Sequence, residues 1–342
     1  MSVAVIGAGN FGTVIANNIA GNGTPTRLWM RDEEQLADMR KHNENRRYLP
    51  GHAIHRNIIP TTDLEQAVSS SELVFVTVPS SSFRQVARDI GIHLKNGTYA
   101  VSATKGVEAE TFKLMSEILA EELPPSSVGV LSGPNLAEEI AAGKFAGTVI
   151  ASGDGMLREL VQERLSSATF RVYSSEDVYG VELGGALKNI YAIICGIATA
   201  LDLGQNAISL VITRSLVEMS RFAEAMKGNP YTFLGLAGVG DLVATCTSPH
   251  SRNYQLGYHI ASGLSLEDAM ARLGKLAEGV NTLKAVYQRN LEMRLYMPLA
   301  DALYRVLFDE EDLQATIVDL MTTEQKSDVE FAEQHTSTNA PR

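Results

Sequence analysis

A glycine-rich turn near the N-terminus constrains the fold of this chain more than any other feature. The apolar run Val3–Ile6 predicts a buried strand, and the hexapeptide GAGNFG, with glycines at Gly7, Gly9 and Gly12, follows it directly. Apolar residues then recur at helical spacing up to Gly21. Between a strand and a helix, such glycines allow a tight turn, close backbone approach to a pyrophosphate and close helix packing. An ordinary glycine-rich turn does not require a strand before it and a helix after it. The sequence therefore predicts a dinucleotide cradle.

Further apolar runs predict more strands of the same sheet, with helical stretches between most of them. The expected strands are Thr26–Met30, Leu73–Val78, Tyr99–Ala103, Val128–Ser132 and Thr148–Ser152. Alternating strands and helices are typical of a mostly parallel sheet covered on both faces. This half is predicted to be an α/β, Rossmann-like domain over residues 1–177.

The second half of the chain has a different, almost purely helical pattern. Helices are predicted over 178–203, 206–227, 231–246, 252–262, 266–273, 279–290 and 298–308. We therefore expect an all-α domain over residues 178–330 that supplies substrate-side chemistry. The polar residues 331–342 are predicted to be a disordered tail.

Charge and cysteine content exclude several classes of protein. The formal net charge of −11 argues against nucleic-acid and anionic-membrane partners, which need a basic surface. Two cysteines, Cys195 and Cys246, cannot form a disulfide framework or a zinc site, so both are expected in the core and no metal site is predicted. No signal peptide or apolar run of about 20 residues is visible, so we expect a cytoplasmic protein without membrane insertion.

The end of the second predicted strand is the place where dinucleotide-binding folds read the adenosine ribose. Arg31 and Asp32 stand there. An acid favours the 2′-hydroxyl of NAD, whereas an arginine accommodates the 2′-phosphate of NADP. Because Arg31 comes first, NADP is the expected cofactor and NAD is also expected to be usable. A solvated charge pair is the alternative.

Lys188 is the residue of the helical half that most strongly indicates function. Its predicted helix is apolar almost all round, so the lysine should be buried, which is costly without a partner or ligand. Gly184 and Gly185 occupy the preceding turn, toward which helical side chains lean, and should leave space beside the amine. The alternative is a lysine whose amine reaches the surface.

Polar residues follow two of the predicted strands, at the edge where α/β sheets bind ligands. Lys105 follows the strand Tyr99–Ala103, although many lysines simply end strands. The turn with Gly133 and Asn135 follows Val128–Ser132, and Asn135 could instead cap a helix. These residues are candidates for contacts with substrate or nicotinamide.

Two further polar groups lie in the helical half. Asp241 and Thr245 are four residues apart and share a helix face, although an aspartate there is more often an N-cap. The segment Ser251-Arg252-Asn253 combines a guanidinium with hydroxyl and amide donors, which suits a phosphate dianion. By itself this segment would be read as a solvated loop.

Taken together, these motifs resemble the bacterial NAD(P)-dependent glycerol-3-phosphate dehydrogenases over about residues 2 to 325. The matching segments, in order, are VIGAGNFGT, VTVPS, ATKGVE, LSGPNLAEE, VELGGALKNIYAI, GLAGVGDLVATCTSPHSRN, AEGVNTLKAV and MPLADALYRVL. The GALKN and GDLVATCTS…SRN blocks are specific to the family, whereas the glycine motif is not. Phe11, Asn135 and the pair Arg31-Asp32 depart from common members.

The resemblance implies reduction of dihydroxyacetone phosphate to sn-glycerol 3-phosphate for glycerophospholipid synthesis. It also implies a Rossmann domain, a C-terminal domain like that of 6-phosphogluconate dehydrogenase, and a homodimer. Lys188, Asp241 and Lys105 would be catalytic. Substrate would be held by Lys105, Gly133, Asn135, Lys188, Asp241, Thr245, Ser251, Arg252 and Asn253. The cofactor would be held by Gly7, Gly9, Asn10, Phe11, Gly12, Arg31, Tyr48, Lys105, Ala137, Arg252 and Glu278.

Two other functions are compatible with parts of this pattern. A related two-domain dehydrogenase acting on a β-hydroxyacid or ketopantoate would share the cradle and an active lysine, but not the Arg252-Asn253 loop in this form. A non-catalytic dinucleotide-sensing protein would have no reason to bury Lys188 beside two glycines.

Overall fold

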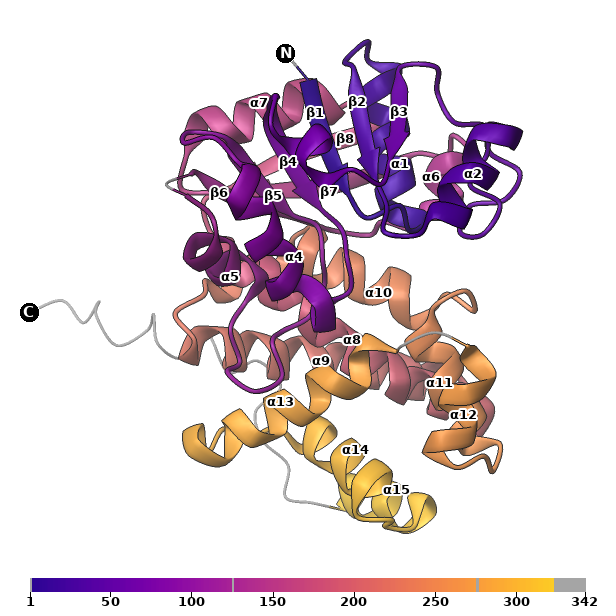
Figure 1. Cartoon of the computed structure of the whole chain (residues 1–342). Coiled ribbons are helices and arrows are strands. Elements are labelled where there is room, and N and C mark those ends of the chain that lie inside the picture. The colour runs from indigo at the N-terminus through magenta and orange to yellow at the C-terminus, as the bar shows by residue number, and fades with distance from the viewer. Residues whose placement is uncertain (1, 125, 275–276, 323–342) are drawn as a thin grey trace, which may run out of the picture.

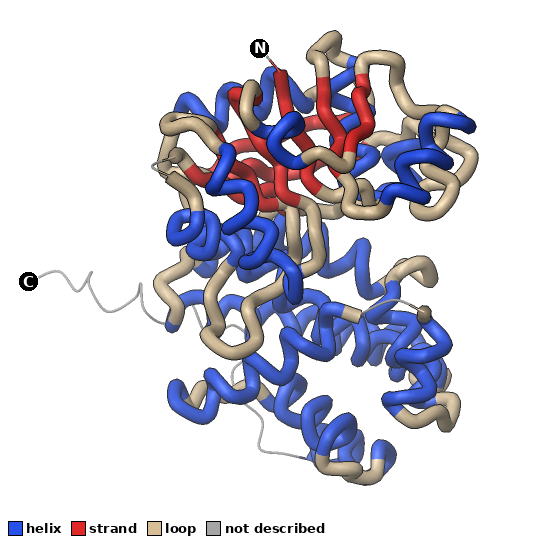
Figure 2. Tube along the Cα trace, viewed as in Figure 1, coloured by secondary structure: helices blue, strands red, loops and turns tan. Residues whose placement is uncertain are grey.

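The structure, a computed structural model, describes residues 2–124, 126–274 and 277–322. The predicted tail at 331–342, and the end of the second predicted domain from residue 323, lie outside the described residues. Strands occupy the first half of the described chain and helices fill the second (Figures 1 and 2).

An eight-stranded sheet forms the first half, in the order β3-β2-β1-β4-β5-β6-β7-β8. Neighbours pair in parallel except β6 and β7, which are antiparallel. The first six strands follow the dinucleotide-binding order. The strands are β1 (Ser2–Ile6), β2 (Thr26–Trp29), β3 (Ile58–Thr61), β4 (Ser71–Val76), β5 (Tyr99–Ser102), β6 (Val128–Ser132), β7 (Ala146–Ala151) and β8 (Phe170–Ser175).

The six strands predicted from the sequence are present within two residues, but the prediction missed the two edge strands. β3 is only four residues long and contains Pro60, which an edge strand tolerates and a central strand does not. β8 alternates, with Phe170 and Val172 buried and Arg171 and Tyr173 exposed. Edge strands have one neighbour, so their sequences carry a weaker apolar signal.

Helices cover both faces of the sheet, as predicted, and bury two apolar layers. One layer lies under α1 (Asn10–Gly21), α2 (Glu33–His42), α6 (Ala137–Ala141) and α7 (Gly155–Leu165). The other lies under α3 (Leu64–Val68), α4 (Ser80–His93) and α5 (Met115–Glu122). The carboxyl ends of the parallel strands face the helical half (Figure 1).

The second half consists of helices joined by turns and loops, with no strand among its described residues. Its long elements are α8 (Val178–Ala200), α9 (Gly204–Ala225), α11 (Arg252–Ala261), α12 (Leu266–Leu273), α13 (Glu278–Met293), α14 (Pro298–Phe308) and the unpredicted α15 (Leu313–Thr322). The free cysteines are both buried here.

The helix predicted over 231–246 is wrong as a single element. It is broken into a 3₁₀ turn η1 (Pro230–Leu234), a π-helical turn η2 (Leu236–Gly240) and the short helix α10 (Asp241–Cys246). A β-carbon at Gly238 would lie 2.2 Å from the α-carbon of Phe233, so the glycine lets η1 and η2 pack tightly. π-Helical turns of this kind often occur at functional sites.

Helix α8 is the centre of the helical half and also its contact with the sheet. It has the length and composition of a membrane-crossing helix, but 83% of its most apolar window is buried inside the structure. Val181 of α8 and Ala237 of η2 pack against Val130, Val149 and Ala151 of β6 and β7. Its apolar character is therefore that of a core helix.

Candidate active site

The glycine turn has the geometry that a dinucleotide cradle requires. Gly7 has a φ of +117°, and a β-carbon there would lie 2.7 Å from Oγ1 of Thr77. A β-carbon at Gly12 would lie 1.9 Å from the carbonyl oxygen of Gly7, so only glycine lets α1 approach the turn. A β-carbon at Gly9 would meet no atom within 4 Å, so this side of the turn is open. Helix α1 begins at Asn10 with no acidic side chain in its first turn, which leaves its positive end suited to a phosphate.

The carboxylate of Asp32 is already engaged at the end of β2. It caps α2 by accepting from the backbone N–H groups of Glu34 and Gln35, and it accepts from Nη1 of Arg47 at 2.5 Å. These hydrogen bonds lower the pKa of Asp32. The Arg47 guanidinium in turn lies 5.4 Å from the ring centroid of Tyr48. Arg31 is exposed beside them.

Lys105, Asp241 and Lys188 form one charged cluster, although they are far apart in sequence. Oδ1 of Asp241 accepts from Nζ of Lys188, and Oδ2 accepts from Nζ of Lys105 at 2.6 Å. Lys188 also donates to Oγ1 of Thr245 at 2.6 Å, and Lys105 donates to the carbonyl of Gly133 at 2.9 Å. One buried carboxylate thus joins an ammonium group from the sheet to one from α8.

Lys188 is 6% exposed, so the alternative of an amine that reaches the surface is wrong. Burial lowers the pKa of Lys188 to about 7, while the charge of Asp241 raises this pKa and that of Lys105 lowers it further. An amine with a pKa near neutrality can both give and accept a proton at working pH. Asp241, only 1% exposed, is the first residue of α10 rather than its N-cap.

The two glycines before Lys188 act differently from the expectation that they leave open space. A β-carbon at Gly184 would lie 2.4 Å from the carbonyl oxygen of Ala237, so this glycine lets the η2 backbone pack on α8. A β-carbon at Gly185 would lie 2.5 Å from Oγ of Ser132 and 3.5 Å from Cγ of Lys105. The space beside the amine is therefore occupied by the segment that carries Asp241, by Ser132 at the end of β6 and by Lys105 after β5.

The rim of the sheet leaves two buried polar atoms without a partner among the described residues. These are Oγ of Ser132 and Oδ1 of Asn135. Asn135 donates through its amide to Oγ1 of Thr148 at 2.9 Å and does not cap α6, whose N-cap is Leu136. Buried polar atoms in proteins are nearly always satisfied, so these two atoms are open to partners from a ligand bound beside the lysine cluster. The sequence prediction missed Ser132, because a serine inside a strand carries no signal.

In the segment 251–253, two side chains make structural hydrogen bonds and one is exposed to solvent. Ser251 caps α11 by accepting from the N–H of Tyr254, and Arg252 is exposed at the first position of that helix. Asn253 is buried, donates to Oδ1 of Asn189 at 2.9 Å and accepts from the N–H of Gly279 at 3.0 Å. Its amide therefore connects α11 to α13 and to α8, where the contact is with the residue directly after Lys188.

Glu278 connects the helical half to the sheet beside the predicted cofactor site. Its carboxylate accepts from Oγ of Ser80 at 2.5 Å, at the start of α4. A β-carbon at Gly106 would lie within 3.3 Å of both side chains, so Glu278 also lies close to the strand end that carries Lys105. Ala137, another predicted cofactor residue, is buried at the start of α6.

Helix α8 is anchored by two buried carboxylates that the sequence reasoning did not identify. Glu182 accepts from the N–H and hydroxyl of Ser116 at the start of α5. Tyr191 donates to Glu218, which also accepts from the N–H of Leu299 at the start of α14. Burial raises the pKa of Glu182 and of Glu218 to about 7 in each case. Lys188 lies between these two anchors.

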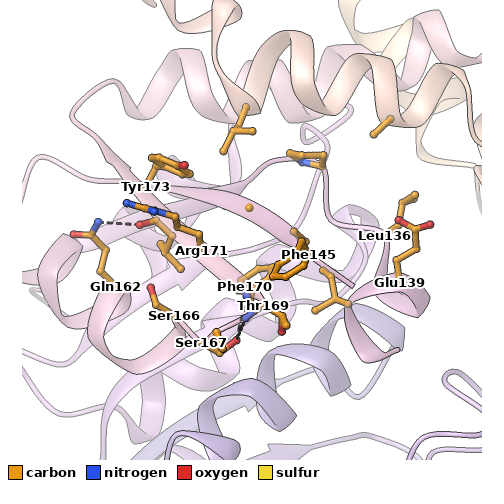
Figure 3. A pocket seen from close by; sticks show the side chains of 18 residues that line it. Leu136, Glu139, Phe145, Gln162, Ser166, Ser167, Thr169, Phe170, Arg171 and Tyr173 are labelled. Atoms are coloured by element: carbon orange, nitrogen blue, oxygen red, sulfur yellow. Dashed lines mark hydrogen bonds between the residues drawn. The ribbon is translucent and has the colours of Figure 1, made fainter. Parts of the chain in front are cut away.

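A cleft of about 840 Å³ lies near this cluster but does not contain it. Phe145, Arg171 and Tyr173 project along it (Figure 3). Its lining residues Pro134 and Leu136 flank Asn135, and Ala244 precedes Thr245, but Lys105, Lys188 and Asp241 do not line it. The lysine cluster, rather than this cleft, is the candidate active site.

In the part of the chain that the structure describes, no group of three His, Cys, Asp or Glu side chains could hold a metal ion.

Comparison with known proteins identifies the family. Residues 2–157 match the family described as NAD-dependent glycerol-3-phosphate dehydrogenase N-terminus, and residues 177–318 match the corresponding C-terminus. The glycerol-3-phosphate dehydrogenase [NAD(P)+] of Azotobacter vinelandii is 54% identical over 329 residues, which are 96% of each chain. The enzyme of the same name from Pseudomonas syringae is 54% identical over 331 residues, also 96% of each chain.

Solved structures agree with these matches. The crystal structure of glycerol-3-phosphate dehydrogenase from Coxiella burnetii is 34% identical, with a TM-score of 0.90 over 94% of this chain and 99% of the other. A ketopantoate reductase from Ralstonia eutropha is only 16% identical, with a TM-score of 0.54, over 90% of this chain and 97% of the other, and shares the fold alone. This chain belongs to the NAD(P)-dependent glycerol-3-phosphate dehydrogenase family.

Proposed function

We propose that the chain interconverts dihydroxyacetone phosphate and sn-glycerol 3-phosphate, with Lys188, Asp241 and Lys105 as its catalytic residues. The family supplies the activity. The observation that carries the assignment of roles is the single carboxylate of Asp241 held between two ammonium groups beside buried, unpartnered polar atoms. The site thus combines excess positive charge with groups able to bind oxygen atoms of a ligand.

The chemistry divides between the cofactor and the chain. When bound, the reduced nicotinamide supplies the hydride for the carbonyl carbon. Lys188 gives its proton to the ketone oxygen, whose developing negative charge is stabilised by the neighbouring ammonium of Lys105. Asp241 holds both amines in place, and Thr245 fixes the direction of Lys188. In the reverse reaction the neutral Lys188 amine accepts the proton.

Substrate binding is assigned to the remaining predicted residues. Gly133 and Asn135 lie on the rim beside Lys105, and the unpartnered Oδ1 of Asn135 is available to a substrate hydroxyl. Arg252 holds the phosphate, with Ser251 and Asn253 shaping the helix start on which it stands. A planar guanidinium binds a phosphate dianion bidentately, which a lysine cannot do.

Cofactor binding is assigned to the glycine turn with Asn10 and Phe11, to Arg31 and Tyr48, and to Ala137 and Glu278 on the facing elements. NADP is the proposed preference, with NAD also used, because Asp32 is already bound to Arg47 and to the start of α2 while Arg31 is exposed. An acid engaged in this way is poorly placed to accept from the ribose 2′-hydroxyl of NAD.

The cellular setting is also a proposal. We expect a soluble homodimer in the cytoplasm that supplies glycerophospholipid synthesis, with residues 1–177 and 178–330 as its two domains. β8 ends at Ser175 and α8 begins at Val178, which supports that division. Sedimentation analysis tests the dimer.

A direct assay tests the activity. Purified protein is mixed with NADPH and dihydroxyacetone phosphate, and absorbance of the reduced nicotinamide is followed. Ketopantoate and unphosphorylated dihydroxyacetone should be very poor substrates. Lys188→Met retains the bulk of the stem without the proton and should lower kcat by about 100-fold or more while the affinity for NADPH is kept. Turnover of Lys188→Met near the wild-type rate would show that Lys188 is structural.

A further inference from the structure

We propose that Asn45 and Gln35 are positioning residues for the dinucleotide, acting through the carbonyl group of Ala8 in the glycine turn. This inference rests on the proposed function, because it concerns the binding of the same cofactor. Neither side chain is among the residues predicted to touch cofactor or substrate. Both come from the segment that follows β2, which includes α2 and the loop after it.

The two amides converge on one backbone oxygen. The carbonyl of Ala8 accepts from Nδ2 of Asn45 at 2.9 Å and from Nε2 of Gln35 at 2.8 Å. Asn45 has no exposed surface, and Gln35 is 8% exposed. A carbonyl that accepts two buried amide donors is held in a fixed direction, because turning it would leave one N–H hydrogen of each amide without its acceptor.

The direction of this carbonyl determines the direction of the next N–H group. In a trans peptide the C=O of Ala8 and the N–H of Gly9 share one plane and point in opposite directions. Anchoring the carbonyl in the interior therefore aims the N–H of Gly9 outward. A β-carbon at Gly9 would meet no atom within 4 Å, so there is open space beside this residue for a pyrophosphate to approach.

The same network reaches the first turn of α1 and the neighbouring loop. Asn45 donates its second amide hydrogen to Oγ1 of Thr13 at 2.8 Å, and this hydroxyl donates to the carbonyl of Gly9 at 2.7 Å. The backbone carbonyl of Asn45 accepts from the N–H groups of Tyr48 and Leu49 at 3.2 and 2.8 Å. Asn45 thus connects the phosphate-facing turn to the loop that carries Tyr48.

A direct binding measurement tests the inference. NADPH and NADH are titrated separately into wild type, Asn45→Leu and Gln35→Met, and the dissociation constants are read from nucleotide fluorescence. Because the pyrophosphate is common to both dinucleotides, Asn45→Leu should raise both dissociation constants about tenfold or more, by similar factors. Gln35→Met leaves one donor on the Ala8 carbonyl and should raise both constants less. At saturating cofactor, kcat should stay near that of wild type.

The matched control is Asn290→Leu in α13. The amide of Asn290 also holds a loop, donating to the carbonyl of Leu295 at 3.1 Å and accepting from its N–H at 2.9 Å, and it is 8% exposed. This variant should lose thermal stability without a change in either dissociation constant. If Asn45→Leu does not fold, Gln35→Met decides.

Two results would overturn the inference. One is a folded Asn45→Leu variant, or a folded Gln35→Met variant where Asn45→Leu does not fold, with dissociation constants within twofold of wild type for both dinucleotides. The other is an equal weakening in Asn290→Leu, which would assign the effect to general destabilisation. Failure of the wild type to bind either dinucleotide would instead overturn the proposed function.

Discussion

Replacing Asp241 by asparagine tests how the lysine cluster sets its protonation. The wild-type carboxylate accepts from Lys188 through one oxygen and from Lys105 through the other, at 2.6 Å for Lys105. Asparagine has nearly the same shape, but it is neutral and offers one oxygen and one N–H₂ group. At least one lysine then loses its acceptor, and both lose the opposing charge.

The size of the effect follows from the burial of the group. Burial already lowers the pKa of Lys188 to about 7, and the charge of Asp241 is what opposes that shift. A hydrogen bond to a charged group contributes about 1.5–3 kcal/mol, and each pH unit corresponds to about 1.4 kcal/mol. Removing it should therefore lower the pKa of Lys188 by about one to two further pH units.

The pH dependence of kcat/KM has opposite signs in the two reaction directions, so measuring both directions tests the protonation of Lys188 specifically. Ketone reduction needs protonated Lys188, so kcat/KM falls as pH rises through its pKa, and oxidation of glycerol 3-phosphate needs the neutral amine, so kcat/KM rises there. In Asp241→Asn both transitions should move to lower pH by the same amount. Initial rates from pH 5 to 9, with saturating cofactor, measure both transitions.

Two outcomes would refute this reasoning. Transitions that stay at the wild-type pH would show that Asp241 does not control the protonation of Lys188. Transitions that move in opposite directions would show that they belong to different groups. The dissociation constant of NADPH, measured alongside, should be close to wild type because Asp241 belongs to the substrate side of the site.

Three further changes test other parts of the assignment. Arg31→Ala should raise KM for NADPH roughly ten- to a hundredfold and leave KM for NADH nearly unchanged; equal effects would contradict a contact with the 2′-phosphate. Arg252→Lys should lower kcat/KM for dihydroxyacetone phosphate by about tenfold or more, and near-normal kcat/KM would rule out bidentate phosphate binding. Burial raises the pKa of Glu182 to about 7, so its contribution to stability is complete below about pH 4.5 and is lost as pH rises through 7. Between pH 5 and 8 the free energy of unfolding should therefore decrease, and Glu182 contributes on the order of 3 kcal/mol to this decrease. The decrease should be smaller in Glu182→Gln, and thermal unfolding at both pH values measures it.

Local features of the molecule could be predicted from the sequence, because they depend on neighbouring residues. The turn at Gly7 and Gly12, the six inner strands and the burial of Lys188 all follow from apolar spacing and from the conformational needs of glycine. The family blocks around Lys188 and Asp241 likewise sufficed to name the activity. The broken helix at 231–246 was missed because a glycine lowers helix stability by only about 1 kcal/mol, so contacts with other elements decide.

The candidate site itself was decided by tertiary structure. Asp241 meets Lys105 and Lys188 across 136 and 53 positions of the chain. No periodicity in the sequence encodes these distances, which depend on η2 packing against Gly184 of α8 and on α8 docking on β6 and β7. The same holds for Asn45, whose side chain acts on a peptide group 37 residues earlier. Sequence patterns specify which surfaces must be buried, whereas the partner that each buried polar group meets is determined only when separate elements pack together.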